Sequence, residues 1–176
     1  MNIRVELEKD HSRTQALKIA KYACLSPKNF QELIACFMDP DNRIAQKAAW
    51  SVSWAAKSKN EFVLPYIKDL ITQIIIPNNA DAIVRNSLRV LELVAIPEVY
   101  HGELMNACFD FVENPTTAIA IKAFSLNILF NLSKTYPEIQ DELKCIIEEQ
   151  WDHETPAFKS RGKKILVQIN KSRKKK

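Results

Sequence analysis

The chain has 176 residues, 47% of them hydrophobic, and a formal net charge of +4. Its only glycines are Gly102 and Gly162, too few for the turns of an all-β protein or for the glycine-rich loops that hold phosphates, dinucleotides or a catalytic serine. Ala, Leu, Ile, Lys, Glu and Gln dominate, and these residues mostly favour helices. A single all-α domain is therefore expected, large enough to bury roughly 70% of the surface that its unfolded chain exposes.

Prolines mark the boundaries of the predicted helices. Eight prolines divide the sequence almost regularly into segments whose apolar residues recur at spacings of three and four, which is typical of helices. Short turns connect these segments, and Ser12, Asp41 and Thr116 are expected to cap three of the helices. The nine expected helices span residues 12–25, 29–38, 41–58, 64–76, 80–95, 100–113, 116–135, 138–151 and 156–171.

Charge is distributed unevenly along the chain. Residues 159–176 carry nine bases and no acid, whereas the rest of the chain carries 16 bases and 21 acids. A basic end on an acidic body often contacts anionic polymers or acidic partners, and a solvated, frayed terminus is the alternative. We expect an N-terminal lead-in over residues 1–11, a single solenoid domain over 12–170, and a basic disordered tail over 171–176.

One feature recurs in every second predicted helix, where a small residue follows a polar or basic one. The small residues are Ala16, Ala48, Ser87, Ala123 and Gly162, at steps of 32, 39, 36 and 39 residues. A small side chain at a helix crossing allows the two helices to approach closely. A period of this length is typical of stacked helix pairs, so each pair is predicted to pack in the same way.

The segment from Phe30 to Trp50 carries a family resemblance. It reads Phe-Gln-Glu-Leu-Ile at residues 30–34 and Pro-Asp-Asn-Arg-Ile-Ala-Gln-Lys-Ala-Ala-Trp at 40–50, which resembles a HEAT-type repeat of the HEAT and armadillo class, and residues 81–85 are the closest echo. The resemblance implies an all-α, right-handed α-α superhelix of about four to five helix pairs. It also implies a binding scaffold, although a fold alone does not establish an activity.

No group of residues predicts catalysis or metal binding. The three histidines are His11, His101 and His153, and the four cysteines are Cys24, Cys36, Cys108 and Cys145. No two histidines have the i, i+4 spacing of a metal site, so surface or capping roles are expected for all three. Each cysteine lies in an apolar helical run, which predicts reduced, buried thiols. We expect no enzymatic activity, no cofactor and no metal.

The binding residues are predicted from helix geometry. Helical positions advance by about 100° per residue, so aligning the repeated small residues at one angle also aligns the outward positions of the second helices. The two outward rows are Thr14, Gln46, Arg85, Ile121 and Ser160, and Lys18, Trp50, Arg89, Ser125 and Lys164. If second helices line a concave surface, these rows form a ridge along it. The predicted binding residues are Lys18, Gln46, Trp50, Trp54, Arg85, Arg89 and Lys164.

Two classes of partner fit this surface. Cations beside an aromatic ring suit an acidic peptide or protein, and equally a nucleic-acid backbone with stacked bases. A solvated face, with Trp50 and Trp54 packed against neighbouring helices, is the third interpretation. In helix 116–135 the equivalent line is largely apolar, so either another helix covers it or it forms an apolar floor that favours a protein partner. This line is Ile121, Ser125, Ile128 and Leu132. A protein or acidic peptide is the expected partner, nucleic acid is the alternative, and no membrane partner is expected.

Two further expectations concern activity and location. The HEAT-like DNA glycosylases are also helical solenoids with tryptophans and an acid in a basic face, but Ser53, Trp54 and Lys57 follow Trp50 here, so the acid one turn on is missing. The first residues contain no apolar signal region, and no apolar run approaches about 18 residues. A cytoplasmic location is therefore expected.

Overall fold

The computed structural model describes the backbone of residues 1–173 and the side chains of residues 1–171. All regular structure in that part of the chain is helical, which confirms the predicted all-α class. The chain forms two compact units, which comprise residues 1–96 and residues 97–176. The single domain predicted over 12–170 stays a prediction.

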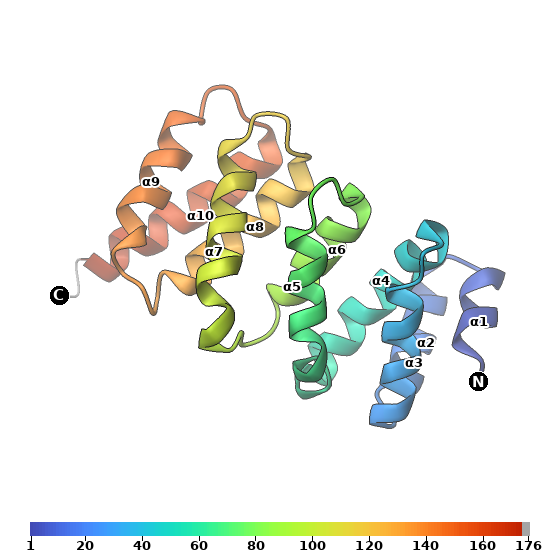
Figure 1. Cartoon of the computed structure of the whole chain (residues 1–176). Helices are drawn as coiled ribbons and strands as arrows, with labels where there is room; N and C mark the ends of the chain where they lie inside the picture. The colour runs from blue at the N-terminus through green and yellow to red at the C-terminus, as the bar shows by residue number, and fades with distance from the viewer. Residues whose placement is uncertain (174–176) are drawn as a thin grey trace. The chain divides into compact units, whose positions relative to one another are not determined.

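The first unit contains six α-helices and two short 3-10 turns. They are α1 (Ile3–Lys9), α2 (Arg13–Ala23), α3 (Pro27–Phe37), α4 (Asn42–Ser58), η1 (Asn60–Phe62), η2 (Leu64–Tyr66), α5 (Ile67–Ile75) and α6 (Asp81–Leu91). The second helices α2, α4 and α6 pack against one another in series, with α3 against α2 and α4, and α5 against α6. In Figure 1, α3 and α5 accordingly lie in front of the layer formed by α2, α4 and α6.

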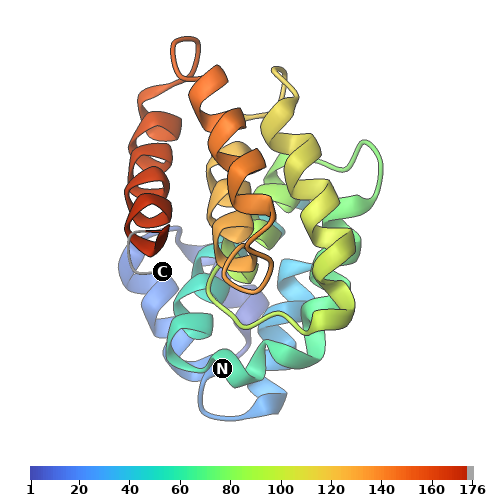
Figure 2. The same cartoon turned by 90° about the vertical axis from the view of Figure 1, so that its left-hand side faces the viewer.

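The second unit contains η3 (Glu98–Tyr100), α7 (His101–Glu113), α8 (Ile119–Leu132), α9 (Ile139–Glu149) and α10 (Pro156–Arg173). Its helices run roughly alongside one another (Figure 2), and α8 packs against α7, α9 and α10. Helix α8 is apolar on nearly all sides, as expected of a helix surrounded by others. Its line Ile121, Ser125, Ile128 and Leu132 is buried. Of the two interpretations of this line, coverage by other helices is therefore correct.

The nine predicted helices are all present, with three corrections. Residues 3–9 of the expected lead-in form α1, which Asn2 caps by accepting a hydrogen bond from the backbone N–H of Val5. Thr116 caps no helix, because its hydroxyl and backbone N–H both donate to Asn114 and α8 begins only at Ile119. Helix α10 continues through Lys171 to residue 173, so it includes the first residues of the predicted tail; residues 174–176 lie outside the described part of the chain.

Ser12 and Asp41 cap their helices as predicted. The Ser12 hydroxyl accepts a hydrogen bond from the backbone N–H of Gln15 at 3.2 Å, and the Asp41 carboxylate accepts one from Arg43 N–H at 2.9 Å. Both side chains satisfy backbone donors that the first turn of a helix leaves unpaired. The beginnings of α2 and α4 are therefore specified by local sequence.

The five small residues of the second helices are all buried, as Ala16, Ala48, Ser87, Ala123 and Gly162 are each almost inaccessible to solvent. The small apolar face of α4 is buried too, and the neighbouring second helices pack against one another. The common orientation predicted for these helices therefore holds within each unit.

Replacing Ser87 by Ala is expected to stabilise the first unit by up to about 1 kcal/mol. The Ser87 hydroxyl is fully buried and has no hydrogen-bond partner among the described residues, so its desolvation is uncompensated. Ser53 is a matched control, because its buried hydroxyl donates to the Ala49 carbonyl oxygen at 2.8 Å. Urea unfolding followed by circular dichroism should show a higher midpoint for S87A and an equal or lower one for S53A. Loss of stability in S87A would contradict the assignment.

Candidate binding surface

The second helices of the first unit carry an excess of positive charge. Helices α2 and α4 each contain three bases and no acid, and α6 contains two bases and one acid, Asp81. The bases are Arg13, Lys18, Lys21, Arg43, Lys47, Lys57, Arg85 and Arg89. Helices α1, α3 and α5 instead contain four bases and four acids. Positive charge within this unit is therefore concentrated in one layer of helices.

Each of these helices exposes one stripe of side chains at least partly to solvent. Together they form what we call the second-helix face: Arg13, Thr14, Lys18 and Lys21 on α2, Gln46, Trp50, Trp54 and Lys57 on α4, and Ala82, Arg85 and Arg89 on α6. Because α4 packs between α2 and α6, the three stripes lie on adjacent helices. This face contains six of the seven predicted binding residues.

Both tryptophans of the face have neighbours at or just before the start of α2. The ring of Trp50 lies edge-on to His11, with centroids 5.5 Å apart. The Arg13 guanidinium carbon lies 5.6 Å, and the Lys57 ammonium 5.3 Å, from the Trp54 ring centroid, within the range of cation–π attraction. The tryptophans therefore pack against neighbours, as the third interpretation expected, and both keep part of their surface in solvent.

Lys18 is held by an acid from α1. Its ammonium lies 2.7 Å from a carboxylate oxygen of Glu6, which also accepts hydrogen bonds from Lys9 at 2.6 Å and Gln15 at 2.9 Å. These contacts, that with Lys18 first, lower the pKa of Glu6 to about 2 from an ordinary value near 4.5. Lys18 is therefore already neutralised by an ion pair within the protein. The sequence did not reveal this ion pair because Glu6 lies twelve residues away.

The Glu6 contacts predict a pH dependence of stability. Since the pKa of Glu6 is lower in the folded state, its contribution is complete above about pH 4.5 and is lost as the pH falls towards 2. Replacing Glu6 by Gln removes this titration. The urea midpoint of the wild type should exceed that of E6Q at pH 6, and the difference should shrink steadily between pH 4.5 and pH 2. Other carboxylates titrate in both proteins, so a difference independent of pH would contradict the assignment.

Arg85 and Arg89 are two neighbouring cations of the face that have no ion-pair partner among the described residues. They lie one turn apart on α6, both half-buried, and neither forms an ion pair within the described part of the chain. Side chains at i and i+4 of a helix are neighbours on its surface. Two guanidinium groups therefore project from neighbouring positions of α6, and neither is paired with Asp81, which lies one turn before Arg85.

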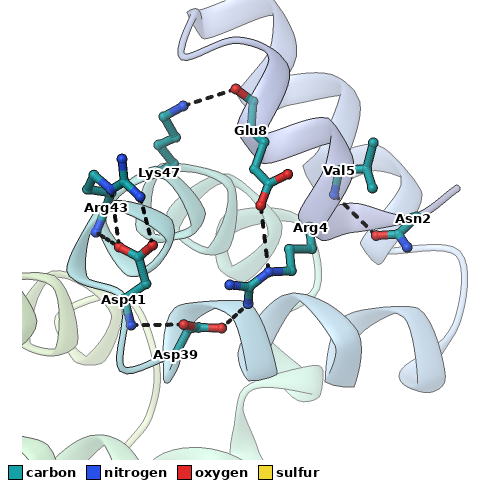
Figure 3. A network of polar contacts seen from close by, with 8 residues as sticks. All are labelled: Asn2, Arg4, Val5, Glu8, Asp39, Asp41, Arg43 and Lys47. Carbon is teal, nitrogen blue, oxygen red and sulfur yellow. Dashed lines mark hydrogen bonds and ion pairs between the residues drawn. The ribbon is translucent and has the colours of Figure 1, made fainter.

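The first unit also contains a polar network that sequence analysis missed (Figure 3). Arg4 of α1 pairs with Asp39 and, at 3.7 Å, with Glu8. Asp39 also accepts a hydrogen bond from the backbone N–H of Asp41 at 2.9 Å, and the Lys47 ammonium donates to the Glu8 carbonyl oxygen at 3.4 Å. These contacts hold α1 against α4 and the connection between α3 and α4, and both Arg4 and Lys47 have acceptors within the protein.

Lys164 lies in the second unit, exposed on α10. The equivalent residues of α8, Ile121 and Ser125, are buried, so the predicted ridge has no exposed member on that helix. Charge is nevertheless segregated here as well, since α10 contains six bases and no acid, whereas α7 and α9 contain seven acids and one base. The helix pairs therefore share two features: a buried small residue in the second helix and an alternation of charge between the two helices. Such repetition is typical of a helical repeat protein.

Comparison with known families agrees with this description. A family model described as HEAT repeat domain matches residues 3–169, nearly the whole chain. The protein belongs to the HEAT repeat family. No curated protein and no solved structure matches the chain.

The cysteines of this HEAT repeat domain differ from the prediction. All four are free, but only Cys36 and Cys108 are buried. Burial raises the pKa of Cys108 to about 12, which makes its thiol a poor nucleophile. Cys145 is exposed, and its thiol donates to Glu149 at 3.2 Å, because its position on α9 faces away from the inward-facing Ile146 and Ile147.

Two general properties of the HEAT repeat domain bear on its chemistry. Among the described residues, no three His, Cys, Asp or Glu side chains gather closely enough to hold a metal ion. No described helix is long and apolar enough to cross a bilayer.

One histidine contacts a polar side chain among the described residues. The Nδ1 atom of His101 lies 3.0 Å from the Tyr136 hydroxyl. The concentration of bases and the two partly exposed tryptophans make the second-helix face the candidate site.

Proposed function

We propose that this HEAT repeat domain is a non-enzymatic scaffold that binds a segment of a partner protein on its second-helix face. HEAT repeats generally mediate protein interactions, and the feature that supports this face is its charge. All eight bases of α2, α4 and α6 are at least partly exposed within a layer that contains one acid, and one of them, Lys47, donates a hydrogen bond to α1.

Aromatic and cationic side chains together suit a protein partner. Trp50 and Trp54 supply large, rigid apolar area, and tryptophan and arginine carry much of the binding energy of protein interfaces. The flanking cations favour acidic partners and exclude basic ones through like-charge repulsion. An acidic segment with apolar side chains would use both features.

Site-specific crosslinking tests the proposal. A photoreactive phenylalanine analogue at Gln46, exposed at the centre of the face, should crosslink a defined partner in cells. The same analogue at Glu32, exposed on α3, serves as the matched control. Capture from position 46 that is lost with Trp50→Ala supports the proposal, and equal capture from both positions would refute it.

Nucleic acid is the second candidate, supported by the same cations and the tryptophans. Each phosphate neutralised by a base releases counterions, so affinity for labelled single- and double-stranded oligonucleotides should fall steeply with salt. Arg85→Ala/Arg89→Ala should weaken such binding and make the salt dependence shallower. If fluorescence anisotropy detects no binding at low salt, this candidate is wrong.

A further inference from the structure

Glu6 shows how this fold binds an acid. Its carboxylate is bound by Lys18 and Gln15 of α2 at 2.7 and 2.9 Å, and Gln15 also donates to the Glu6 carbonyl oxygen at 2.8 Å. Helix α1 thus places a carboxylate against α2, the first of the three second helices in this unit. Lys18, at one end of the second-helix face, is therefore already bound to a side-chain carboxylate.

The positions of Lys18 and Arg89 are equivalent in the repeat. Lys18 follows the buried Ala16 by two residues, and Arg89 follows the buried Ser87 by two. Arg85 precedes Ser87 by two residues, as Thr14 precedes Ala16. Both pairs therefore project from the same side of their helices, and the position that binds an acid on α2 is an arginine on α6.

The two sites differ in occupancy. Lys18 has Glu6, whereas Arg85 and Arg89 have no carboxylate partner within the described residues. Half-burial limits the water that solvates the two guanidinium groups, and guanidinium binds carboxylates through two parallel hydrogen bonds. Neighbouring side chains at i and i+4 are about 6 Å apart, close to the spacing of about 6.6–6.8 Å between alternate residues of an extended peptide.

We infer that Arg85 and Arg89 bind two side-chain carboxylates of an acidic protein segment, in the manner in which Lys18 binds Glu6. This inference rests on the proposed function and specifies the partner's chemistry at that face. Trp50 occupies the position on α4 equivalent to Arg89, and it offers partly exposed apolar surface on the helix that packs against α6. The occupant is therefore a peptide with closely spaced Glu or Asp residues.

Three labelled probes of twelve units test the inference by fluorescence anisotropy. They are a peptide of alternating Glu and Ala, its Gln and Ala counterpart, and oligothymidylate. The acidic peptide should bind the wild type, and Arg85→Ala/Arg89→Ala should weaken that binding by at least about tenfold, because hydrogen bonds between charged groups are the stronger kind. Arg85→Lys/Arg89→Lys keeps the charge without the planar fork and should give an intermediate loss.

A charge-matched variant separates local binding from net charge. Lys28→Ala/Lys68→Ala removes two exposed bases from α3 and α5 of the same unit and should change the affinity less than twofold. Circular dichroism and urea midpoints verify that all variants are folded.

Four results would overturn the inference: no binding of the acidic peptide, equal losses in both double-alanine variants, equal affinity for the Gln peptide, or tighter binding of oligothymidylate. Crosslinking from position 46 that persists after any of these results would leave the proposed function intact. Its absence would refute the proposed function itself.

Discussion

Replacing Glu154 by Ala is expected to destabilise the second unit by about 3–5 kcal/mol. Lys122 is the fourth residue of helix α8, and only 4% of its side chain is exposed. Its ammonium contacts a Glu154 carboxylate oxygen at 2.5 Å and the Gln150 side-chain oxygen at 3.3 Å. Without Glu154 the buried charge has only the amide oxygen of Gln150. Removing one member of a buried ion pair leaves a charge in a medium that solvates it poorly.

Removing the lysine should cost much less. Lys122→Met replaces the buried charge by an apolar chain of similar length, and Glu154, in the α9–α10 connection, can turn towards water. We expect a loss of about 1 kcal/mol for K122M and little further loss when E154A is added, since exchange of a buried pair for apolar residues is often neutral.

Urea unfolding of the two single variants and the double variant gives the coupling energy between these residues. The exposed pair of Lys144 and Glu148, 3.8 Å apart on α9, is the control, and Glu148→Ala should change stability by less than about 0.5 kcal/mol. If E154A behaves like E148A, Lys122 is not held as the structure shows.

Replacing Gly162 by Leu is expected to destabilise the second unit by about 3 kcal/mol. A Cβ atom at residue 162 would lie 2.8 Å from Cγ2 of Ile147 and 3.4 Å from Cζ3 of Trp151. Ile147 is fully buried, and its β-branched side chain cannot easily rotate away. Helix α10 can approach α9 this closely only without a side chain at this position.

Alanine substitutions make the test sharper. Gly162→Ala combines the clash with the gain in helix propensity of about 1 kcal/mol, so a smaller net loss is expected. A Cβ atom at Gly102 of α7 would meet no neighbouring atom within 4 Å, so Gly102→Ala should stabilise by up to about 1 kcal/mol. Thermal or urea midpoints that move in the same direction for G162A and G102A would contradict the proposed close packing.

The segregation of charge between first and second helices connects fold to function. Alternate helices of a repeat lie in different layers, so alternating charge along the sequence becomes two chemically different surfaces. In the second unit, acids dominate α7 and α9 while bases dominate α10. In the first unit, the same alternation leaves the second-helix face with Arg85 and Arg89 available to a partner.

Local sequence was sufficient for the helices, the caps at Ser12 and Asp41, and the orientation of the second helices. Each of these depends on residues within one or two turns of one another, and the buried small residues recur in every repeat. Helix α1 was missed because it has only seven residues. An isolated helix of that length is unstable, and contacts such as that of Arg4 with Asp39 hold it in place.

The binding surface depended on contacts that only the tertiary structure contains. The outward row of α8 is buried because three helices surround it, Lys122 is neutralised by Glu154, and Lys18 is occupied by Glu6. A helical angle specifies which way a side chain projects from its own helix, but whether it meets water, another helix or an acid depends on residues distant in the chain. For that reason the pattern identified the candidate cations, and the packing showed that Lys18 is paired with Glu6 whereas Arg85 and Arg89 have no ion pair among the described residues.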